Sequence, residues 1–257
     1  MTRRQDVLDH GYVELVESWG SDERIIESAR MSTHKSFLGW RRCSYCGQYD
    51  GDQGTCPSHS AGLHDYQPAD EKLLRHLWEN KHSTPFEFAG LTVEVQAPIM
   101  VFREWHRHRV PFGYSELSAR YTPMPDVNYV PSVERLTMGG DDKNKQAGTI
   151  KGAAVLSPHG AEVFQKRLQW LYTEAESLYQ EALKAGVPKE LARLCIPVGR
   201  YSRMRATGNL RGWCGFLGLR MAPQAQWEIR QFAEVVHDLL SEAFPRTLAL
   251  FDEGRKV

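Results

Sequence analysis

One uninterrupted helical pattern constrains the fold of this chain more than any other feature. It begins at Ser157-Pro158, a typical helix start, and ends at Gly186, which is followed by Pro188. Its apolar stripe consists of Val163, Phe164, Leu168, Leu171, Ala175, Leu178, Ala182 and Leu183. This spacing predicts the longest helix of the molecule.

Shorter patterns on both sides of this helix indicate a mixture of strands and helices. Alternating apolar and polar residues predict strands over 12–17 and 90–96, with an extended piece around 196–204. Helical spacing predicts helices over about 22–31, 98–107, 209–219 and 223–243. A further helix is expected to begin with Asp70 as its N-cap, and Pro245 is expected to end the last helix of the chain. Residues 122–156 are rich in turn formers and predict an irregular stretch. A regular βαβ alternation and a glycine fingerprint are both missing, so we expect an α+β fold. A single domain over residues 1–257, with a loop inserted at about 33–69, fits this pattern.

The charge balance limits the classes of function. Lys plus Arg and Asp plus Glu both number 32, so the formal net charge is zero. A neutral chain is a poor candidate for a protein that coats nucleic acid by electrostatics alone. The sequence has no apolar run of the ~18–20 residues that cross a bilayer, and its first residues lack the apolar core of a signal peptide. We expect a soluble protein of the cytoplasm that does not bind membranes.

Cysteines in the predicted insertion have the spacing of a metal site. The pattern is Cys43-x2-Cys46-x9-Cys56-x2-His59, in which two close pairs of ligands can complete a tetrahedron around one zinc ion. His34 or His64 could replace His59, and free cysteines in a surface loop are the alternative. Four protein ligands leave no open position, so the zinc would be structural. The remaining cysteines, Cys195 and Cys214, have apolar neighbours and are interpreted as core thiols.

Arginine is concentrated towards the C-terminus. Residues 191–220 contain six arginines and no Asp, Glu or Lys: Arg193, Arg200, Arg203, Arg205, Arg211 and Arg220. Arginine binds phosphate through two parallel hydrogen bonds, so the window predicts an anion site. The alternative is a solvated face whose partner carboxylates lie elsewhere in the chain. A second cationic cluster covers residues 103–109 and Arg120.

Four sequence blocks resemble the flavin-dependent thymidylate synthases. Residues 105–121 read WHRHRVPFGYSELSARY, which is similar to the family signature of Arg-His-Arg, seven residues and Ser. The other blocks are 82–87 (HSTPFE), 97–103 (APIMVFR) and a C-terminal block from Asn209 to Ile229. The order and distances fit over roughly residues 10–32, 70–131 and 155–250.

The chain departs from the family pattern at several places. Eight residues separate Arg109 from Ser118, one more than the family spacing, and we place the extra residue in the loop 110–114. Glu104 stands where the family commonly has glutamine. Gly215 and Gln224 occupy positions that often carry Asn and His, and typical members lack the zinc-knuckle insertion.

The resemblance implies a fold, an activity and an assembly. Members have a small twisted antiparallel sheet packed with helices, and they form homotetramers with active sites between subunits. They are methyltransferases that convert dUMP into dTMP with FAD, NADPH and 5,10-methylenetetrahydrofolate. The flavin carries the redox step and stacks on the pyrimidine, so the resemblance implies that no protein nucleophile is required.

Site residues follow from the same resemblance. The implied FAD contacts are Ser32, His82, Thr84, Glu87, Arg107, His108, Arg109, Asn209 and Arg211. The implied dUMP contacts are Glu104, Glu116, Ser118, Arg120, Arg193 and Arg220, among which Arg220, Ser118 and Glu104 are the catalytic candidates. Arg120, Arg193 and the Ser118 hydroxyl can hold the phosphate, and Arg220 can polarise a carbonyl of the pyrimidine. No base is evident beside Ser118, so binding is favoured over a role as nucleophile.

Two alternative functions stay open at this point. An ionised Glu104 could accept a hydrogen bond from the exocyclic amine of cytosine. The chain would then be a flavin-dependent hydroxymethyltransferase of dUMP or dCMP, or a dCMP-directed variant. The third hypothesis is a non-enzymatic nucleic-acid binder that uses the zinc knuckle and the arginines; the neutral net charge argues against nucleic acid as a partner.

Overall fold

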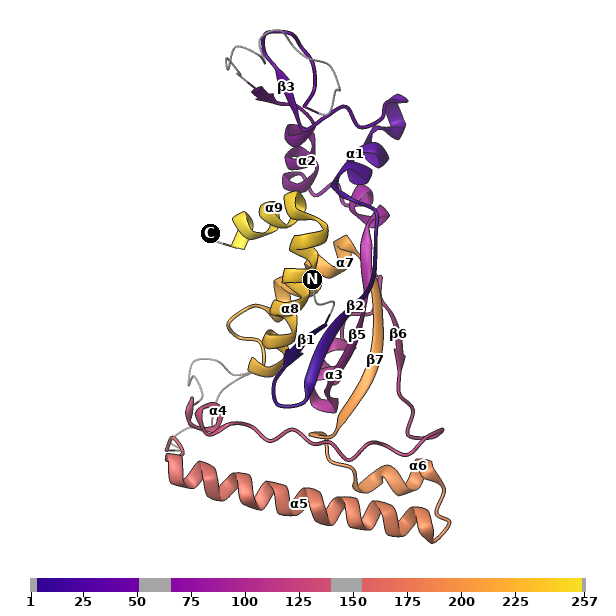
Figure 1. Ribbon diagram of the computed structural model, residues 1–257, viewed down its shortest axis with the longest axis vertical. Helices are drawn as coiled ribbons and strands as arrows, with labels where there is room; N and C mark the ends of the chain where they lie inside the picture. Colours follow the sequence, from indigo (N-terminus) through magenta and orange to yellow (C-terminus); the bar gives the residue numbers. More distant parts are fainter. Residues whose placement is uncertain (1–3, 51–65, 140–153, 256–257) are drawn as a thin grey trace. The chain divides into compact units, whose positions relative to one another are not determined.

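A five-stranded sheet with helices forms the framework of the protein (Figure 1). The structure, a computed structural model, describes residues 4–50, 66–139 and 154–255. The strand order of the sheet is β1-β2-β5-β7-β6, with β1–β2 and β6–β7 antiparallel. A separate two-stranded sheet pairs β3 with β4. The strands are β1 (Arg4–Val7), β2 (Gly11–Trp19), β3 (Arg41–Cys43), β4 (Tyr66–Pro68), β5 (Gly90–Pro98), β6 (Gly113–Glu116) and β7 (Tyr201–Asn209).

The helices fall between and after the strands without a regular alternation. The α-helices are α1 (Asp22–Arg30), α2 (Asp70–Glu79), α3 (Ile99–Trp105), α4 (Val133–Thr137), α5 (Pro158–Lys184), α6 (Lys189–Ala192), α7 (Leu210–Arg220), α8 (Trp227–Ala243) and α9 (Pro245–Arg255). Short 3₁₀ turns are η1 (Met31–Thr33), η2 (Thr84–Phe88) and η3 (Arg193–Cys195). The mixture confirms the predicted α+β class. Among the described helices, none is long and apolar enough to cross a membrane.

The chain divides into two compact units. The first comprises Met1–Val16, Thr92–Thr207 and Gly215–Val236, and the second comprises Glu17–Leu91, Gly208–Cys214 and His237–Val257. Each unit has its own buried apolar residues, and each is described separately below.

Alternation along the central strands builds the core of the first unit. Val93 and Val95 of β5 are fully buried, whereas the alternate residues Thr92, Glu94 and Gln96 are partly exposed. The indole of Trp105, at the end of α3, lies with its ring centroid 4.7 Å from that of Phe216 and 6.5 Å, edge-on, from that of Phe232. Aromatic side chains bury a large apolar area each, so this cluster fixes α3 firmly in place.

A buried carboxylate organises the second unit. Asp22, the first residue of α1, accepts hydrogen bonds from the backbone N–H groups of Arg246 and Thr247 and from the Thr247 hydroxyl. These N–H groups belong to the first turn of α9, where they have no partner within the helix. Burial raises the pKa of Asp22, and the three hydrogen bonds act in the opposite direction.

Several helix ends differ from the sequence prediction. Ser21 caps α1, since its hydroxyl accepts from the backbone N–H of Arg24. Asp70 does not cap α2. It is the first residue of the helix, and its carboxylate pairs with Arg30 and accepts from the N–H of Leu38. Pro245 does not end the helical part of the chain but begins α9, which proline permits at a first helical position.

Helix α5 confirms the predicted length but not the environment of its stripe. Four stripe residues, Val163, Phe164, Leu171 and Leu178, are 43–56% exposed in the single chain. The helix instead buries Tyr172 and Tyr179. The face of α5 that carries Tyr172 and Tyr179 therefore packs against the rest of the first unit, and part of its apolar stripe stays exposed to solvent.

Candidate active site

Arg220, the last residue of α7, is held by three hydrogen bonds. Its Nη1 lies 2.5 Å from Glu104 Oε2, its Nη2 donates to the Glu104 carbonyl oxygen at 2.7 Å, and its Nε lies 2.9 Å from His108 Nε2. Glu104 belongs to the last turn of α3, where carbonyl groups lack partners within the helix. The end of α3 therefore offers both a carboxylate and a carbonyl to one guanidinium.

The imidazole of His108 completes this cluster as a hydrogen-bond acceptor. Its ring packs edge-on against Phe216 with 5.0 Å between the ring centroids. Burial, together with the Arg220 cation, lowers the pKa of His108 to about 4. The ring is therefore neutral at pH 7, and Nε2 can accept from the Arg220 guanidinium.

The other predicted nucleotide residues lie on β6 and the loop that follows it. Glu116, at the end of β6, accepts from the Ser202 hydroxyl at 2.7 Å, because β6 pairs with β7. The Ser118 hydroxyl accepts from the backbone N–H of Arg120 at 3.3 Å. The Arg120 guanidinium lies 3.3 Å from the carboxylate of Glu190 on α6. One segment thus presents a carboxylate, a hydroxyl and a cation in sequence.

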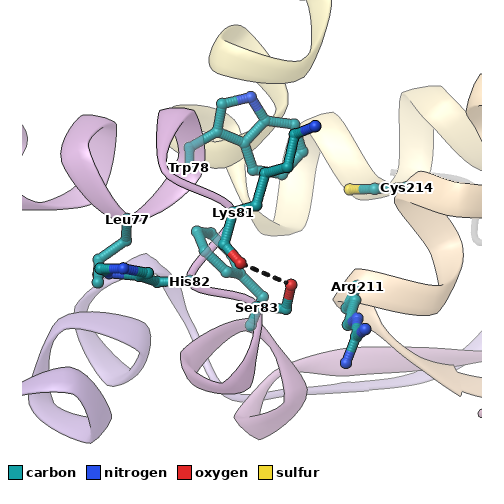
Figure 2. A pocket seen from close by; sticks show the side chains of 8 residues that line it. Leu77, Trp78, Lys81, His82, Ser83, Arg211 and Cys214 are labelled. Atoms are coloured by element: carbon teal, nitrogen blue, oxygen red, sulfur yellow. Dashed lines mark hydrogen bonds between the residues drawn. The ribbon is translucent and has the colours of Figure 1, made fainter.

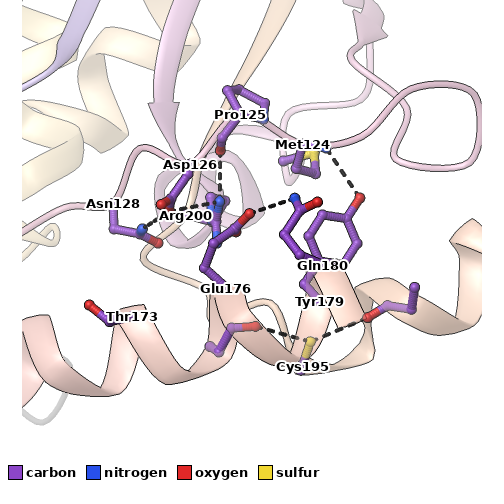
Figure 3. A network of polar contacts seen from close by, with 12 residues as sticks. Met124, Pro125, Asp126, Asn128, Thr173, Glu176, Tyr179, Gln180, Cys195 and Arg200 are labelled. Carbon is purple, nitrogen blue, oxygen red and sulfur yellow. Dashed lines mark hydrogen bonds and ion pairs between the residues drawn. The ribbon is translucent and has the colours of Figure 1, made fainter. Parts of the chain in front are cut away.

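A buried polar network holds the continuation of this loop against α5 (Figure 3). The fully buried Arg200 donates to the Pro125 carbonyl at 2.8 Å and to Glu176 Oε2 of α5 at 2.6 Å, and its Nη1 lies 3.2 Å from Asp126. The Tyr179 hydroxyl accepts from the backbone N–H of Met124 at 3.2 Å. The loop that carries Ser118 and Arg120 is therefore anchored a few residues downstream.

In the second unit, part of the predicted flavin set lies around η2 and the start of α7. Arg211 forms a 2.5 Å ion pair with Glu87. The Asn209 side chain accepts from the backbone N–H of Gly212 at 2.9 Å and so caps α7. Thr84 begins η2, the turn that also contains Glu87.

A cavity of about 290 Å³ adjoins these residues within the second unit (Figure 2). Its lining consists of Leu77, Trp78, Lys81, His82, Ser83, Phe86, Arg211 and Cys214. Burial raises the pKa of the Cys214 thiol to about 12, so this side chain is a neutral, apolar part of the wall. Of the lining residues, only His82 and Arg211 were predicted from the sequence. Ser83 and Phe86 belong to the same 82–87 block as His82, whereas Leu77, Trp78, Lys81 and Cys214 lie outside the sequence blocks that indicated the site or were not assigned to it.

The remaining predicted residues are exposed. Ser32 lies in η1 and donates its hydroxyl to the Ala29 carbonyl at 3.3 Å. Arg107 and Arg109 follow α3, and Arg193 lies in η3. Within the described ranges, these three guanidinium groups have no ion pair. Six of the predicted FAD residues belong to the second unit and three, Arg107 to Arg109, to the first.

The arginine-rich window does not form one anion site. Five of its six arginines pair with carboxylates from other segments: Arg200 with Glu176 and Asp126, Arg203 and Arg205 with Glu94, Arg211 with Glu87, and Arg220 with Glu104. The alternative interpretation, that partner carboxylates lie elsewhere, therefore accounts for most of the window. Only Arg193 lacks such a partner among the residues that the structure describes.

Half of the predicted zinc knuckle lies in the described part of the chain. Cys43 ends β3 with its side chain buried, and its carbonyl accepts from the N–H of Gly47 at 2.9 Å. Gly47 has a φ of +74°, which closes a tight turn around Cys46. Cys56, His59 and the alternative ligand His64 lie outside the described residues. No group of three possible ligands occurs in the ranges that are described. Cys214 is buried and Cys195 is partly buried against core residues, as expected for structural thiols.

Comparison with known proteins identifies the family. Residues 14–246 match the model of the Thy1 family, thymidylate synthase complementing protein. A flavin-dependent thymidylate synthase of Thermus thermophilus is 33% identical over 247 residues, covering 96% of this chain and 77% of the relative. One from Thermotoga neapolitana is 31% identical over 245 residues, covering 95% and 92%. The chain belongs to the Thy1 family.

Solved structures agree with this assignment. The UMP/dUMP methylase PolB from Streptomyces cacaoi, in a structure bound with 5-Br dUMP, superposes with a TM-score of 0.72 at 28% identity, covering 97% of both chains. The predicted family and fold are confirmed, and so is the prediction that the chain is a methyltransferase.

Proposed function

We propose that this chain transfers a one-carbon unit to C5 of dUMP and reduces it, forming dTMP in a flavin-dependent reaction. The observation that carries the proposal is the cluster of Arg220, Glu104 and His108 in the same unit as Glu116, Ser118 and Arg120. The guanidinium of Arg220, fixed in orientation, can polarise a pyrimidine carbonyl. Arg120 and Ser118 supply a positive charge and a hydroxyl that can bind a phosphate.

In this proposal the phosphate is held by Arg120, Arg193 and the Ser118 hydroxyl. Arg193 has no competing carboxylate in the described ranges. Arg120 pairs with Glu190, and both side chains of this pair are more than half exposed. An exposed ion pair contributes about 1 kcal/mol or less, so a doubly charged phosphate can displace Glu190.

The residues that would hold FAD are Ser32, His82, Thr84, Glu87, Arg107, His108, Arg109, Asn209 and Arg211. Their chemistry fits the cofactor. Arg107 and Arg109, which have no ion pair within the described ranges, present cations suited to a pyrophosphate, and Trp78 and Phe86 line the cavity beside His82 with apolar surface. Bound FAD would supply hydride transfer, with NADPH and 5,10-methylenetetrahydrofolate as co-substrates. The residues of this chain bind and orient the rings.

Substitution of Arg107 tests the FAD site. Arg107→Ala should lower the affinity for FAD about ten- to hundredfold, because a charge-assisted hydrogen bond contributes about 1.5–3 kcal/mol. Fluorescence titration of the flavin-free protein measures this affinity. Arg103→Ala is the matched control, since Arg103 is an exposed arginine of the same segment outside the proposed set. Equal FAD affinity in both variants would remove Arg107 from the site.

Self-association into a homotetramer is supported by the uncovered apolar face of α5. Trp170 is 64% exposed, in addition to the four exposed residues of the stripe. Apolar surface of this extent favours burial against another protein surface. We propose that copies of the chain cover it, with active sites shared between subunits. Sedimentation of an active, stable monomer would contradict this assembly.

A structural zinc ion bound by Cys43, Cys46, Cys56 and His59 is proposed for the insertion. The turn of Cys43 to Gly47 supports it, because backbone geometry of this kind turns two thiolates towards one ion. Metal analysis should find one zinc per chain in the native protein and less than about a tenth of that amount in Cys43→Ser. Cys195→Ser is the control and should keep its zinc. Full zinc content in Cys43→Ser would exclude the site. A metal site built from cysteine thiolates suits a reducing compartment, and we propose that the protein is cytoplasmic.

A further inference from the structure

Ser202 places a hydroxyl on the buried face of β7, beside apolar residues. Along this face it is followed by the buried Met204 and Ala206, and the residues between them are exposed. Ser202 itself is only 2% exposed. A hydroxyl that is removed from water costs free energy unless it forms a hydrogen bond. Its partner in the structure therefore indicates what this hydroxyl does.

The partner of the hydroxyl is the carboxylate of Glu116. In the β6–β7 pair, Glu116 lies opposite Met204. Ser202 is two positions along the same face of β7, so it is the diagonal neighbour of Glu116 and within reach of a long side chain. The Ser202 hydroxyl donates to Glu116 Oε1 at 2.7 Å. Because serine has a single O–H donor, that donor is used entirely on the carboxylate.

The other oxygen of Glu116 faces an imidazole without bonding to it. Oε2 lies 4.0 Å from His106 Nε2, which is longer than a hydrogen bond. The His106 ring is held in turn by Tyr114, against which it packs edge-on with 4.9 Å between the ring centroids. The Glu116 side chain is 33% exposed. Ser202 therefore fixes one oxygen of the carboxylate, while the other keeps the capacity to accept from a ligand.

We propose that Ser202 is a positioning residue, whose buried hydroxyl holds the Glu116 carboxylate in the orientation that accepts a hydrogen bond from the nucleotide. This inference rests on the proposed function, because that function assigns Glu116 to the nucleotide. Without the hydroxyl, the Glu116 side chain is free to change rotamer, and ligand binding has to order it. Ser202 thus affects the affinity for the nucleotide. It leaves the affinity for FAD unchanged, since Glu116 is outside the proposed FAD set.

The experiment is a double-mutant cycle on the binding of dUMP to the FAD-loaded protein, measured by titration calorimetry. Ser202→Ala should weaken dUMP binding about three- to tenfold, which is the effect of one side chain that has to be ordered on binding. In the Glu116→Ala background, the same substitution should change dUMP affinity by less than about twofold, because the residue through which it acts is gone. A purely structural role of Ser202 would weaken binding in both backgrounds.

Kinetics and a matched control accompany the cycle. Ser202→Ala should raise KM for dUMP and keep kcat within about twofold of wild type, since saturating nucleotide orders Glu116. Its FAD affinity should equal that of wild type. Thr207→Val is the control, because Thr207 also carries a hydroxyl on β7 but is exposed and accepts from the Thr92 hydroxyl at 2.9 Å. This variant should bind dUMP as wild type does.

Two results would overturn the inference and leave the proposed function intact. The first is an equal loss of dUMP affinity on Ser202→Ala in both backgrounds, because Ser202 would then act through the fold and not through Glu116. The second is unchanged dUMP affinity in Ser202→Ala although Glu116→Ala weakens binding. Wild type that does not bind dUMP would overturn the proposed function and the inference together.

Discussion

Replacement of Arg220 by lysine should reduce the turnover of dUMP about a hundred- to thousandfold while leaving bound flavin in place. Lysine keeps the positive charge but has no planar fork, so it cannot keep the contacts to His108, the Glu104 carboxylate and the Glu104 carbonyl at once. The loss corresponds to one donor directed at charge that develops on a carbonyl. Steady-state kinetics at saturating co-substrates measures it.

Arg205→Lys provides the comparison for this prediction. Arg205 belongs to the same arginine-rich window, but its side chain is mostly exposed and pairs with Glu94. We expect its turnover to stay close to wild type. If Arg220→Lys also retained turnover within about tenfold, Arg220 would not be the group that polarises the base.

The second large effect concerns stability. Arg200→Met should lower the free energy of unfolding by about 3–5 kcal/mol, because it leaves the Glu176 carboxylate and the Pro125 carbonyl without their buried partner. For a chain of this length, each kcal/mol corresponds to about 2–4 °C in melting temperature. Thermal unfolding followed by circular dichroism should therefore show a decrease of roughly 10 °C.

Arg203→Met tests whether the loss of stability in Arg200→Met comes from burial of the arginine or only from loss of its charge. Arg203 is also ion-paired, at 3.8 Å from Glu94, but its side chain is 57% exposed. Exposed pairs contribute about 0–1 kcal/mol, so we expect a small shift. Equal melting temperatures for the two variants would show that the Arg200 network does not stabilise the first unit.

Local sequence patterns predicted the long elements well. Helix α5 has a serine cap, a proline in its first turn and a terminating glycine, all within one continuous pattern. Strands β1 and β6 have four residues each, too few for an alternating pattern to stand out. The α9 helix was missed because Pro245 marks a helix start as well as a helix end.

Partners that are distant in sequence could not be predicted. The window of six arginines indicated an anion site, yet Arg220 meets Glu104 across 116 positions of sequence and Arg211 meets Glu87 across 124. Only the pairing of strands and the packing of α3 against α7 bring such residues together. The same limit applies to the α5 stripe, since periodicity indicates an apolar face but not what covers it.

Sequence blocks located part of the candidate site because they combine residue type with fixed spacing. Glu104, Glu116, Ser118 and Arg120 fall within one short segment, and the structure places all of them in the first unit. The 82–87 block also supplies His82, Ser83 and Phe86 to the cavity of the second unit, but it gives no sign of Trp78 and Cys214, which contribute shape and apolar surface.

We propose that the chain methylates C5 of dUMP. The most direct measurement incubates the FAD-loaded protein with dUMP, 5,10-methylenetetrahydrofolate and NADPH and analyses the nucleotide by mass spectrometry. We expect dTMP, heavier than dUMP by one CH2 group, and no such product when FAD is removed. A hydroxymethylated nucleotide, a product from dCMP alone, or unchanged dUMP with fully loaded flavin would contradict it.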